Sequence, residues 1–120
     1  MKIKEVSEIT DLTAVTLRYY EKSGLIPSIQ RKNGIRNYTE TDIEAINFIK
    51  CMRAAGLSVK SLVKYMDLFN RNEDTTSLRK QILATEQQKL KKQIAVMQKS
   101  VEIIDHKLEL YDQGAFKNVH

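Results

Sequence analysis

The stretch TAVTLRYYEKSG, residues 13–24, carries the start and stop signals of one short helix on which the fold depends. Thr13 has the side chain of a helix N-cap, and Gly24 is the residue type that most often ends a helix. Just upstream, apolar residues recur at every third position and predict a shorter helix over 4–10. Two short helices joined by a tight turn are typical of a helix-turn-helix.

The second of these helices has two chemically different sides on a wheel of about 100° per residue. The side assigned to the core consists of Ala14, Leu17, Tyr20 and Glu21. The side assigned to a partner consists of Val15, Arg18, Tyr19 and Lys22. An exposed face of Arg, Tyr and Lys on the second helix of such a unit suits the major groove of DNA. A face that is simply exposed to solvent would show the same pattern. The segment that follows this helix is therefore needed to decide between a DNA-binding face and a solvated one.

A basic hairpin is predicted immediately after the two helices. Asn33-Gly34 is a strong signal for a type I′ turn, which needs two residues with positive φ. Short arms over 28–32 and 35–38 would then form a β-wing. Residues 12–39 hold five basic side chains and one acidic side chain, an excess of four in a chain of net charge +5. This concentration of positive charge indicates a polyanionic partner.

Two further helices follow the hairpin. The first begins near Thr39 or Thr41, either of which can cap it, and runs to about Ala55 before Gly56. The second is capped by Ser58 and spans about 59–70. Its apolar face is expected to contain Leu62, Met66 and Phe69.

The last predicted element is a long helix over 77–111 with a heptad seam. The seam residues are Leu83, Leu90, Ile94, Met97, Val101, Ile104, Leu108 and Tyr111, with polar Gln87 at one seam position. Such a helix is too long to bury a one-sided seam against a small domain, so a coiled-coil homodimer through 77–111 is predicted. A hairpin within one chain is the alternative, but no Gly or Pro interrupts 77–113.

Composition narrows the class of protein. The chain has 120 residues and one cysteine, which excludes an internal disulfide and fits a reducing compartment. The sequence contains no run of about 18 apolar residues, so no membrane span is predicted. Its N-terminus is charged and has no apolar stretch, so no export signal is predicted. A cytoplasmic protein is therefore expected. Neither a nucleophile–base pair nor a phosphate-binding glycine loop is visible, so we expect no enzyme, no catalytic residue and no cofactor.

Four stretches resemble one family in both order and spacing: IKEVSEIT, TLRYYEKSGLIP, NGIRNYTETDI and FIKCMRAAGLSVKSL. They are similar to the MerR family of bacterial transcription regulators. The resemblance implies a mostly α fold, with a winged helix-turn-helix DNA-binding domain over 1–70, a dimerisation helix over 71–113 forming an antiparallel coiled coil, and a short tail over 114–120. Asp11 departs from the pattern, which usually has glycine in this turn; Asp tolerates the left-handed conformation, so the turn is expected to survive.

The resemblance also implies roles for individual residues. Thr16, Arg18 and Tyr19 would contact DNA from the second helix. Arg36 and Tyr38 would contact the phosphate backbone from the wing, and Lys60 would add a phosphate contact from the fourth helix. The implied mechanism is that the dimer binds double-stranded promoter DNA and distorts it, realigning promoter elements for RNA polymerase.

The remaining question is what such a protein would sense, and Cys51 is the strongest candidate. The tail has no cysteine, and His106 and His120 do not form a metal-ligand spacing, so no metal site is expected. On the wheel of its helix, Cys51 lies 80–100° from an apolar stripe of Ala45, Phe48, Ile49, Met52 and Ala55, at the edge of the core. The sequence resembles a short MerR-like subgroup with a lone cysteine in this context that responds to aldehydes and related electrophiles. A simple packing role for Cys51 is the alternative.

Two other functions fit parts of the pattern. A DNA-architectural or excisionase-like protein would share the winged unit without sensing, but it would not need the long heptad helix. A coiled-coil adaptor would share the long helix, and its positive charge would be incidental. The dependence of DNA affinity on salt distinguishes the adaptor from a DNA-binding regulator.

Overall fold

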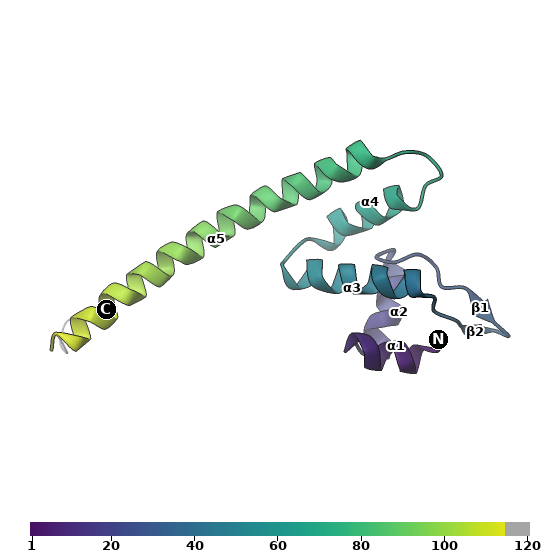
Figure 1. The fold of residues 1–120 in the computed structure, drawn as a ribbon, viewed down its shortest axis with the longest axis horizontal. Helices are drawn as coiled ribbons and strands as arrows, with labels where there is room; N and C mark the ends of the chain where they lie inside the picture. The colour runs from purple at the N-terminus through teal and green to yellow at the C-terminus, as the bar shows by residue number, and fades with distance from the viewer. Residues whose placement is uncertain (115–120) are drawn as a thin grey trace. The chain divides into compact units, whose positions relative to one another are not determined.

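The computed structural model describes residues 1–114 and contains five helices and one hairpin in that range (Figure 1). The elements are α1 (Ile3–Thr10), α2 (Ala14–Ser23), β1 (Arg31–Lys32), β2 (Ile35–Arg36), α3 (Glu40–Ala54), α4 (Val59–Phe69) and α5 (Thr76–Asp112). The chain forms two compact units, Met1–Ala84 and a second that begins at Thr85. The predicted fold class, a winged helix-turn-helix followed by a long helix, is confirmed.

The helix-turn-helix is shaped by the local signals predicted for it. The Thr13 side chain accepts a hydrogen bond from the Thr16 backbone N–H at 3.1 Å, and Gly24 ends α2 with φ 83°. Asp11 ends α1 at φ 56° and ψ 37°, which is the left-handed conformation. The turn therefore keeps its geometry with Asp in the place of glycine.

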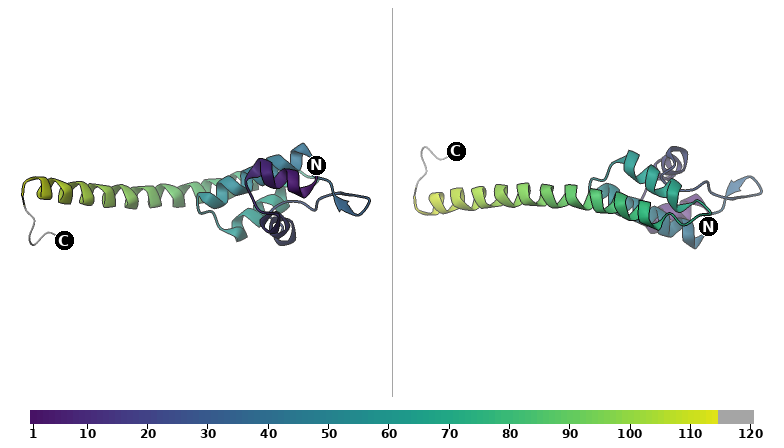
Figure 2. Two further views of the ribbon diagram at one scale, coloured as in Figure 1. Left: turned by 90° about the horizontal axis from the view of Figure 1, so that it is seen from below. Right: turned by 90° about the horizontal axis from the view of Figure 1, so that it is seen from above.

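The wing is a short antiparallel hairpin. Asn33 and Gly34 have φ of 55° and 79°, as a two-residue type I′ turn requires. Arg31 pairs with Arg36 and Lys32 pairs with Ile35, so each strand is only two residues long. The predicted arms over 28–32 and 35–38 are longer than these strands, beyond which one further hydrogen bond joins the Asn37 N–H to the Gln30 carbonyl at 2.8 Å. Both views in Figure 2 show the hairpin extending beyond the helices of its unit.

The starts of α3 and α4 are also set by capping side chains. Thr39, rather than Thr41, caps α3 in a capping box: the Asp42 N–H donates to Thr39 Oγ1 at 3.2 Å, and the Thr39 N–H donates to Asp42 Oδ2 at 2.8 Å. Ser58 caps α4 by accepting from the Ser61 N–H at 3.1 Å.

The core of the first unit collects apolar side chains from α1 to α4 and from the segment after α2. Its most deeply buried members are Val6, Leu17, Leu25, Ile26, Ile46, Ile49 and Leu62. The expected face of α4 was wrong in one position: Leu68 is buried, whereas Phe69 is 51% exposed. Phe69 instead lies beside the start of α5, where the Arg79 guanidinium sits 5.3 Å from its ring centroid.

The 37 residues of α5 form one helix, about 55 Å long at 1.5 Å per residue. The residue just before it, Thr75, is tied to α4 because Thr75 Oγ1 donates to the Leu68 carbonyl at 2.8 Å. The first two turns of α5 group with the N-terminal unit, which ends at Ala84. The domain boundary expected at residue 70 stays a prediction. Apart from Gly114, the tail predicted over 114–120 lies outside the described residues.

Most side chains of the heptad seam of α5 are exposed to solvent in the single chain. Its exposed members are Ile94, Met97, Val101, Ile104, Leu108 and Tyr111, each between 41% and 68% exposed. Solvation of so many apolar side chains on one helical face is unfavourable, so the face needs a partner. Within residues 1–114, no helix is both long enough and apolar enough to span a membrane.

Candidate nucleic-acid interface and cysteine

The outward face of α2 is confirmed as predicted. Leu17 is fully buried and Tyr20 is 6% exposed, whereas Val15 is 73% and Tyr19 is 49% exposed. Arg18 and Lys22 are exposed on the same side. The second helix of the helix-turn-helix therefore presents a basic and aromatic surface, anchored from behind by the core.

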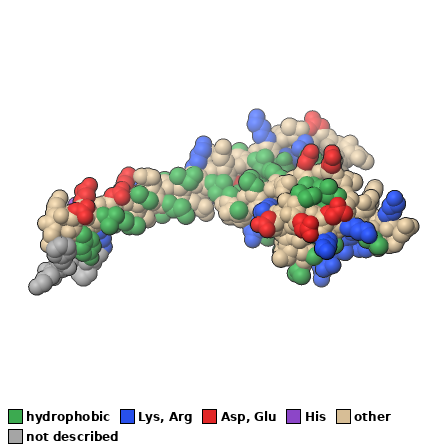
Figure 3. All heavy atoms as spheres, turned by 60° about the horizontal axis from the view of Figure 1, so that its bottom comes forward, with side chains coloured by type: hydrophobic (Ala, Val, Ile, Leu, Met, Phe, Trp, Pro, Cys, Tyr) green, Lys and Arg blue, Asp and Glu red, His purple; other side chains and the backbone are tan. Residues whose placement is uncertain are grey.

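A cleft with a volume of about 470 Å³ opens between this helix and the wing. The residues that line it are Arg18, Glu21, Lys22, Ser28 and Arg36. Three cations therefore share the cleft with one carboxylate, which favours an anionic ligand. Figure 3 shows Lys and Arg side chains gathered at the wing end of the N-terminal unit.

Glu21 fastens the wing to α2. Arg36 Nε donates to Glu21 Oε1 at 2.7 Å, and the Ile29 backbone N–H donates to Glu21 Oε2 at 3.1 Å. The two oxygens of one carboxylate thus hold the strand that leaves the hairpin and the segment that enters it. We call Glu21, Ile29 and Arg36 the wing bracket. The periodicity of α2 puts Glu21 on its inner side but predicts no role for it, because its partners lie 8 and 15 residues away.

The charges in the wing bracket reinforce one another. Partial burial acts to raise the pKa of Glu21, but the hydrogen bonds from Arg36 and Ile29 and the charges of Arg36 and Arg31 outweigh it, so the pKa is lowered overall. The same hydrogen bond raises the pKa of Arg36. Glu21 therefore remains ionised and does not present a free negative charge to an incoming phosphate.

The wing residues predicted to contact phosphate differ in accessibility. The Arg36 side chain is 24% exposed and uses Nε for Glu21, which leaves its terminal nitrogens for another partner. Tyr38 is only 2% exposed, and its hydroxyl is buried without a hydrogen-bond partner among the described residues. Burial raises the pKa of Tyr38. Tyr38 is thus buried in the single chain, within the electrostatic influence of Arg36, Glu21 and Arg18, and its phosphate contact stays a prediction.

Thr16 and Lys60 lie where the sequence analysis expected surface contacts. Thr16 is partly exposed in the first turn of α2, and its hydroxyl oxygen accepts a hydrogen bond from Thr13 Oγ1 at 2.9 Å. Lys60 is exposed in the first turn of α4. The DNA contacts of both residues stay predictions.

Cys51 lies on α3 and is exposed. The predicted core stripe of this helix was only partly right: Ile49 is buried as predicted, but the other buried side chain is Ile46, which lay outside the stripe. Measured from their midpoint at about 100° per residue, Cys51 points about 170° away from the core. It is therefore a surface residue rather than a boundary residue, and a small reagent can reach its thiol.

The two cations that flank Cys51 in sequence are engaged elsewhere. Lys50 Nζ donates to the Thr10 carbonyl at the end of α1 at 2.7 Å. Arg53 donates to the Leu57 carbonyl in the turn before α4 at 2.6 Å. Among residues 1–114, no group of three or more His, Cys, Asp and Glu side chains is placed to hold a metal ion.

Comparison with known proteins places these features in a family. The sequence pattern of the MerR helix-turn-helix family of regulatory proteins matches residues 1–68, and a MerR DNA-binding pattern matches residues 43–107. The chain is 54% identical over 91 residues to the transcriptional regulator AdhR of Bacillus subtilis, an alignment that spans 75% of this chain and 65% of AdhR.

Two crystal structures are similar over most of the chain. A MerR family regulator from Listeria monocytogenes has 41% identity and a TM-score of 0.90, covering 93% of this chain and 86% of its own. HiNmlR, a MerR family regulator lacking the sensor domain and bound to promoter DNA, has 26% identity and a TM-score of 0.83, covering 98% of this chain and 95% of its own.

Proposed function

Because this chain belongs to the MerR family of helix-turn-helix regulatory proteins, we propose that it binds promoter DNA as a homodimer and regulates transcription by changing the shape of that DNA. The observation that carries this proposal is the basic cleft between α2 and the wing. Arg18 and Lys22 line it from the helix, and Arg36 lines it from the wing. Phosphate-binding side chains in this position would hold the duplex while the outward face of α2 enters the major groove.

The seam of α5 supports the homodimer. A second copy of the same helix offers a matching apolar face at the same heptad spacing, so an isologous pair would cover both. The predicted antiparallel orientation would place the two DNA-binding units at opposite ends of the coiled coil. Such a dimer reads two half-sites of a pseudo-palindrome.

Regulation in this proposal acts through DNA deformation. A dimer that changes the relative position of its two DNA-binding units bends or untwists the promoter between the half-sites, which realigns the promoter elements for RNA polymerase. An effector drives this change only if it binds the two dimer states with different affinities. The protein would act in the cytoplasm without enzymatic activity of its own, as its relatives are transcription regulators.

The test of DNA binding is a salt titration with matched variants. Arg18→Gln should reduce the slope of log affinity against log salt by about 1.8, because each phosphate contact contributes about 0.9 and a homodimer has two copies. Arg71→Gln is the control: it removes the same charge from an exposed arginine paired with Asp67. Equal slopes for the two variants would contradict the proposed cleft.

The same experiment separates the competing functions. A DNA-binding regulator should give a two-fold symmetric footprint and steep salt dependence. A coiled-coil adaptor should show neither. An architectural protein should bind DNA with the same salt dependence but show no response to any effector.

For the effector, we propose that Cys51 reacts with small electrophiles such as aldehydes. Its exposure on α3 supports this proposal, because an inert packing cysteine would be buried. The thiolate sulfur would attack the carbonyl carbon, forming a C–S bond while the carbonyl electrons move to oxygen and take up a proton. The adduct adds bulk to the solvent side of α3, where a partner subunit can meet it.

The thiol proposal is tested with Cys51→Ala and Cys51→Ser. Both variants should bind operator DNA as the wild type does and lose induction by formaldehyde in a reporter assay. Mass spectrometry of the wild-type protein after treatment should show an adduct on the peptide that contains Cys51. Normal induction of the alanine variant would leave Cys51 as an ordinary surface residue.

A further inference from the structure

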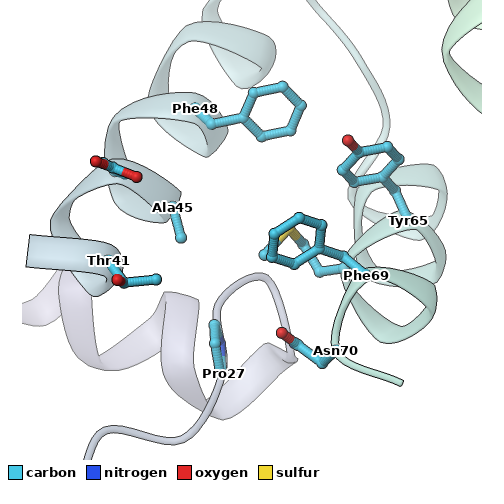
Figure 4. A pocket seen from close by; sticks show the side chains of 9 residues that line it. Pro27, Thr41, Ala45, Phe48, Tyr65, Phe69 and Asn70 are labelled. Carbon is cyan, nitrogen blue, oxygen red and sulfur yellow. The ribbon is translucent and has the colours of Figure 1, made fainter. Parts of the chain in front are cut away.

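A second cavity lies in the N-terminal unit, away from the basic cleft. It has a volume of about 220 Å³ and is formed by α3, α4 and Pro27 (Figure 4). Phe48 and Tyr65 stack on each other along one wall, with ring centroids 5.5 Å apart and 29° between the ring planes, and Phe69 forms another wall. Three aromatic rings around one opening provide an apolar surface for a flat molecule.

The charge of this cavity differs from that of the chain. Lys and Arg make up 20 of the 120 residues, yet none of the nine residues that line the cavity is basic. The only formal charge among them is the carboxylate of Glu44, which is exposed at the surface. The Arg79 guanidinium already lies over the Phe69 ring, so the Glu44 carboxylate and the rings of Phe48 and Tyr65 are the groups that favour a cation here and disfavour an anion.

We infer that this cavity is a binding site for a small aromatic or alicyclic molecule carrying one positive charge, such as an arylalkylamine. The ring system lies against the wall formed by the stacked Phe48 and Tyr65 rings and against Phe69, and the ammonium group lies toward Glu44. The site is distinct from Cys51, which does not line the cavity, and from the cleft between α2 and the wing. It therefore stands whether or not the thiol senses electrophiles.

The position of Pro27 makes the site relevant to DNA binding. Pro27 follows Gly24, the end of α2, by three residues and precedes the wing. A molecule in the cavity thus contacts the segment that joins the two DNA-facing elements. Its effect on DNA affinity depends on how differently it binds the free and DNA-bound forms.

The test uses three naphthalene probes that share a ring system and differ in charge: 1-naphthylmethylamine, 1-naphthalenemethanol and 1-naphthoate. Binding to the full chain is followed by the NMR shifts of the Phe48 and Tyr65 ring protons. The amine should bind up to about fivefold more tightly than the alcohol, the range expected for an exposed carboxylate. The naphthoate should bind most weakly.

Two pairs of variants locate the site. Ala45→Leu fills the cavity wall and should abolish binding of the amine, while Ala54→Leu makes the same change at an exposed position of α3 outside the cavity. Glu44→Gln should remove the preference for the amine over the alcohol, while Glu40→Gln, one turn earlier, should keep it. Absence of saturable shifts with the amine would overturn the inference, as would equal affinity for the amine and the naphthoate or unchanged binding in Ala45→Leu.

Discussion

Glu21 is an acidic residue inside a basic cleft, and its removal gives the sharpest test of the wing bracket. Electrostatics alone predicts that Glu21→Ala strengthens DNA binding, because a negative charge disappears next to Arg18, Lys22 and Arg36. If the carboxylate instead positions the wing, the same substitution should weaken specific binding. The two explanations differ in sign, so one titration separates them.

The cost to stability can be estimated from the contacts. Glu21 accepts one charge-assisted hydrogen bond from Arg36 and one hydrogen bond from the Ile29 N–H. A hydrogen bond to a charged group contributes about 1.5–3 kcal/mol. The two bonds share one carboxylate, and Arg36 is partly solvated and can recover water. We therefore expect Glu21→Ala to lower the free energy of unfolding by about 2–3 kcal/mol, and Glu21→Gln, which keeps an acceptor for Ile29, by about 1 kcal/mol.

The assay is urea unfolding followed by circular dichroism at fixed protein concentration, because dimerisation makes apparent stability depend on concentration. Glu8→Ala is the matched control, since Glu8 is an exposed acid on α1 and its loss makes the same change in net charge. An unfolding free energy within about 0.5 kcal/mol of the wild type for Glu21→Ala would refute the reasoning. So would tighter specific DNA binding by the same variant.

The wing bracket also predicts a dependence on pH. The folded-state pKa of Glu21 lies below the ordinary glutamate value of 4.5, so its contribution to stability is fully present above that value. The contribution is lost as pH falls through the folded-state pKa. The difference in unfolding free energy between wild type and Glu21→Gln should therefore be constant near neutrality and shrink below pH 4.5. A difference that stays constant under acidic conditions would contradict the ion pair.

Three further outcomes are expected. Tyr38→Phe removes a buried hydroxyl without a partner, so urea unfolding should show equal or up to about 1 kcal/mol higher stability, with unchanged DNA affinity; weaker DNA binding would instead mean that the hydroxyl reaches phosphate in the complex. Asp11→Ala should cost about 1 kcal/mol because the residue adopts φ 56°, whereas Asp11→Gly should cost nothing in the same assay. Ile104→Asp should weaken the dimer at least about a hundredfold in sedimentation equilibrium, whereas Ile103→Asp, equally exposed but off the seam, should leave it intact.

The local features of the fold were predictable because their causes are local. Thr13 and Ser58 cap their helices with atoms three residues away, and Asn33-Gly34 needs only its own two φ angles. The inner and outer sides of α2 follow from a periodicity of about 3.6 residues. These signals lie within one helical turn or one hairpin, so the helix ends and the turn can be predicted from the sequence without knowing the tertiary contacts.

Features that depend on distant segments were missed or misplaced. The core side of α3 is set by the helices around it, so Ile46 is buried although it lies outside the predicted stripe, and Phe48 lines a cavity although it lies within it. Phe69 is 51% exposed, and the Arg79 guanidinium from the start of α5 lies over its ring. The role of Glu21 depends on a wing that returns 15 residues later. The periodicity of a single helix cannot predict these contacts, because each of them involves a residue from another segment of the chain.

Lys50 connects the surface around Cys51 to the DNA-reading unit. Its ammonium group holds the carbonyl of Thr10, the last residue of α1, and Thr10 directly precedes the left-handed Asp11 of the turn. Because Lys50 and Cys51 are neighbours on one rigid helix, a shift of α3 along its axis either breaks this hydrogen bond or pulls the end of α1 with it. A displacement of α3 at Cys51 would therefore reach the helix-turn-helix through the hydrogen bond of the adjacent residue, Lys50.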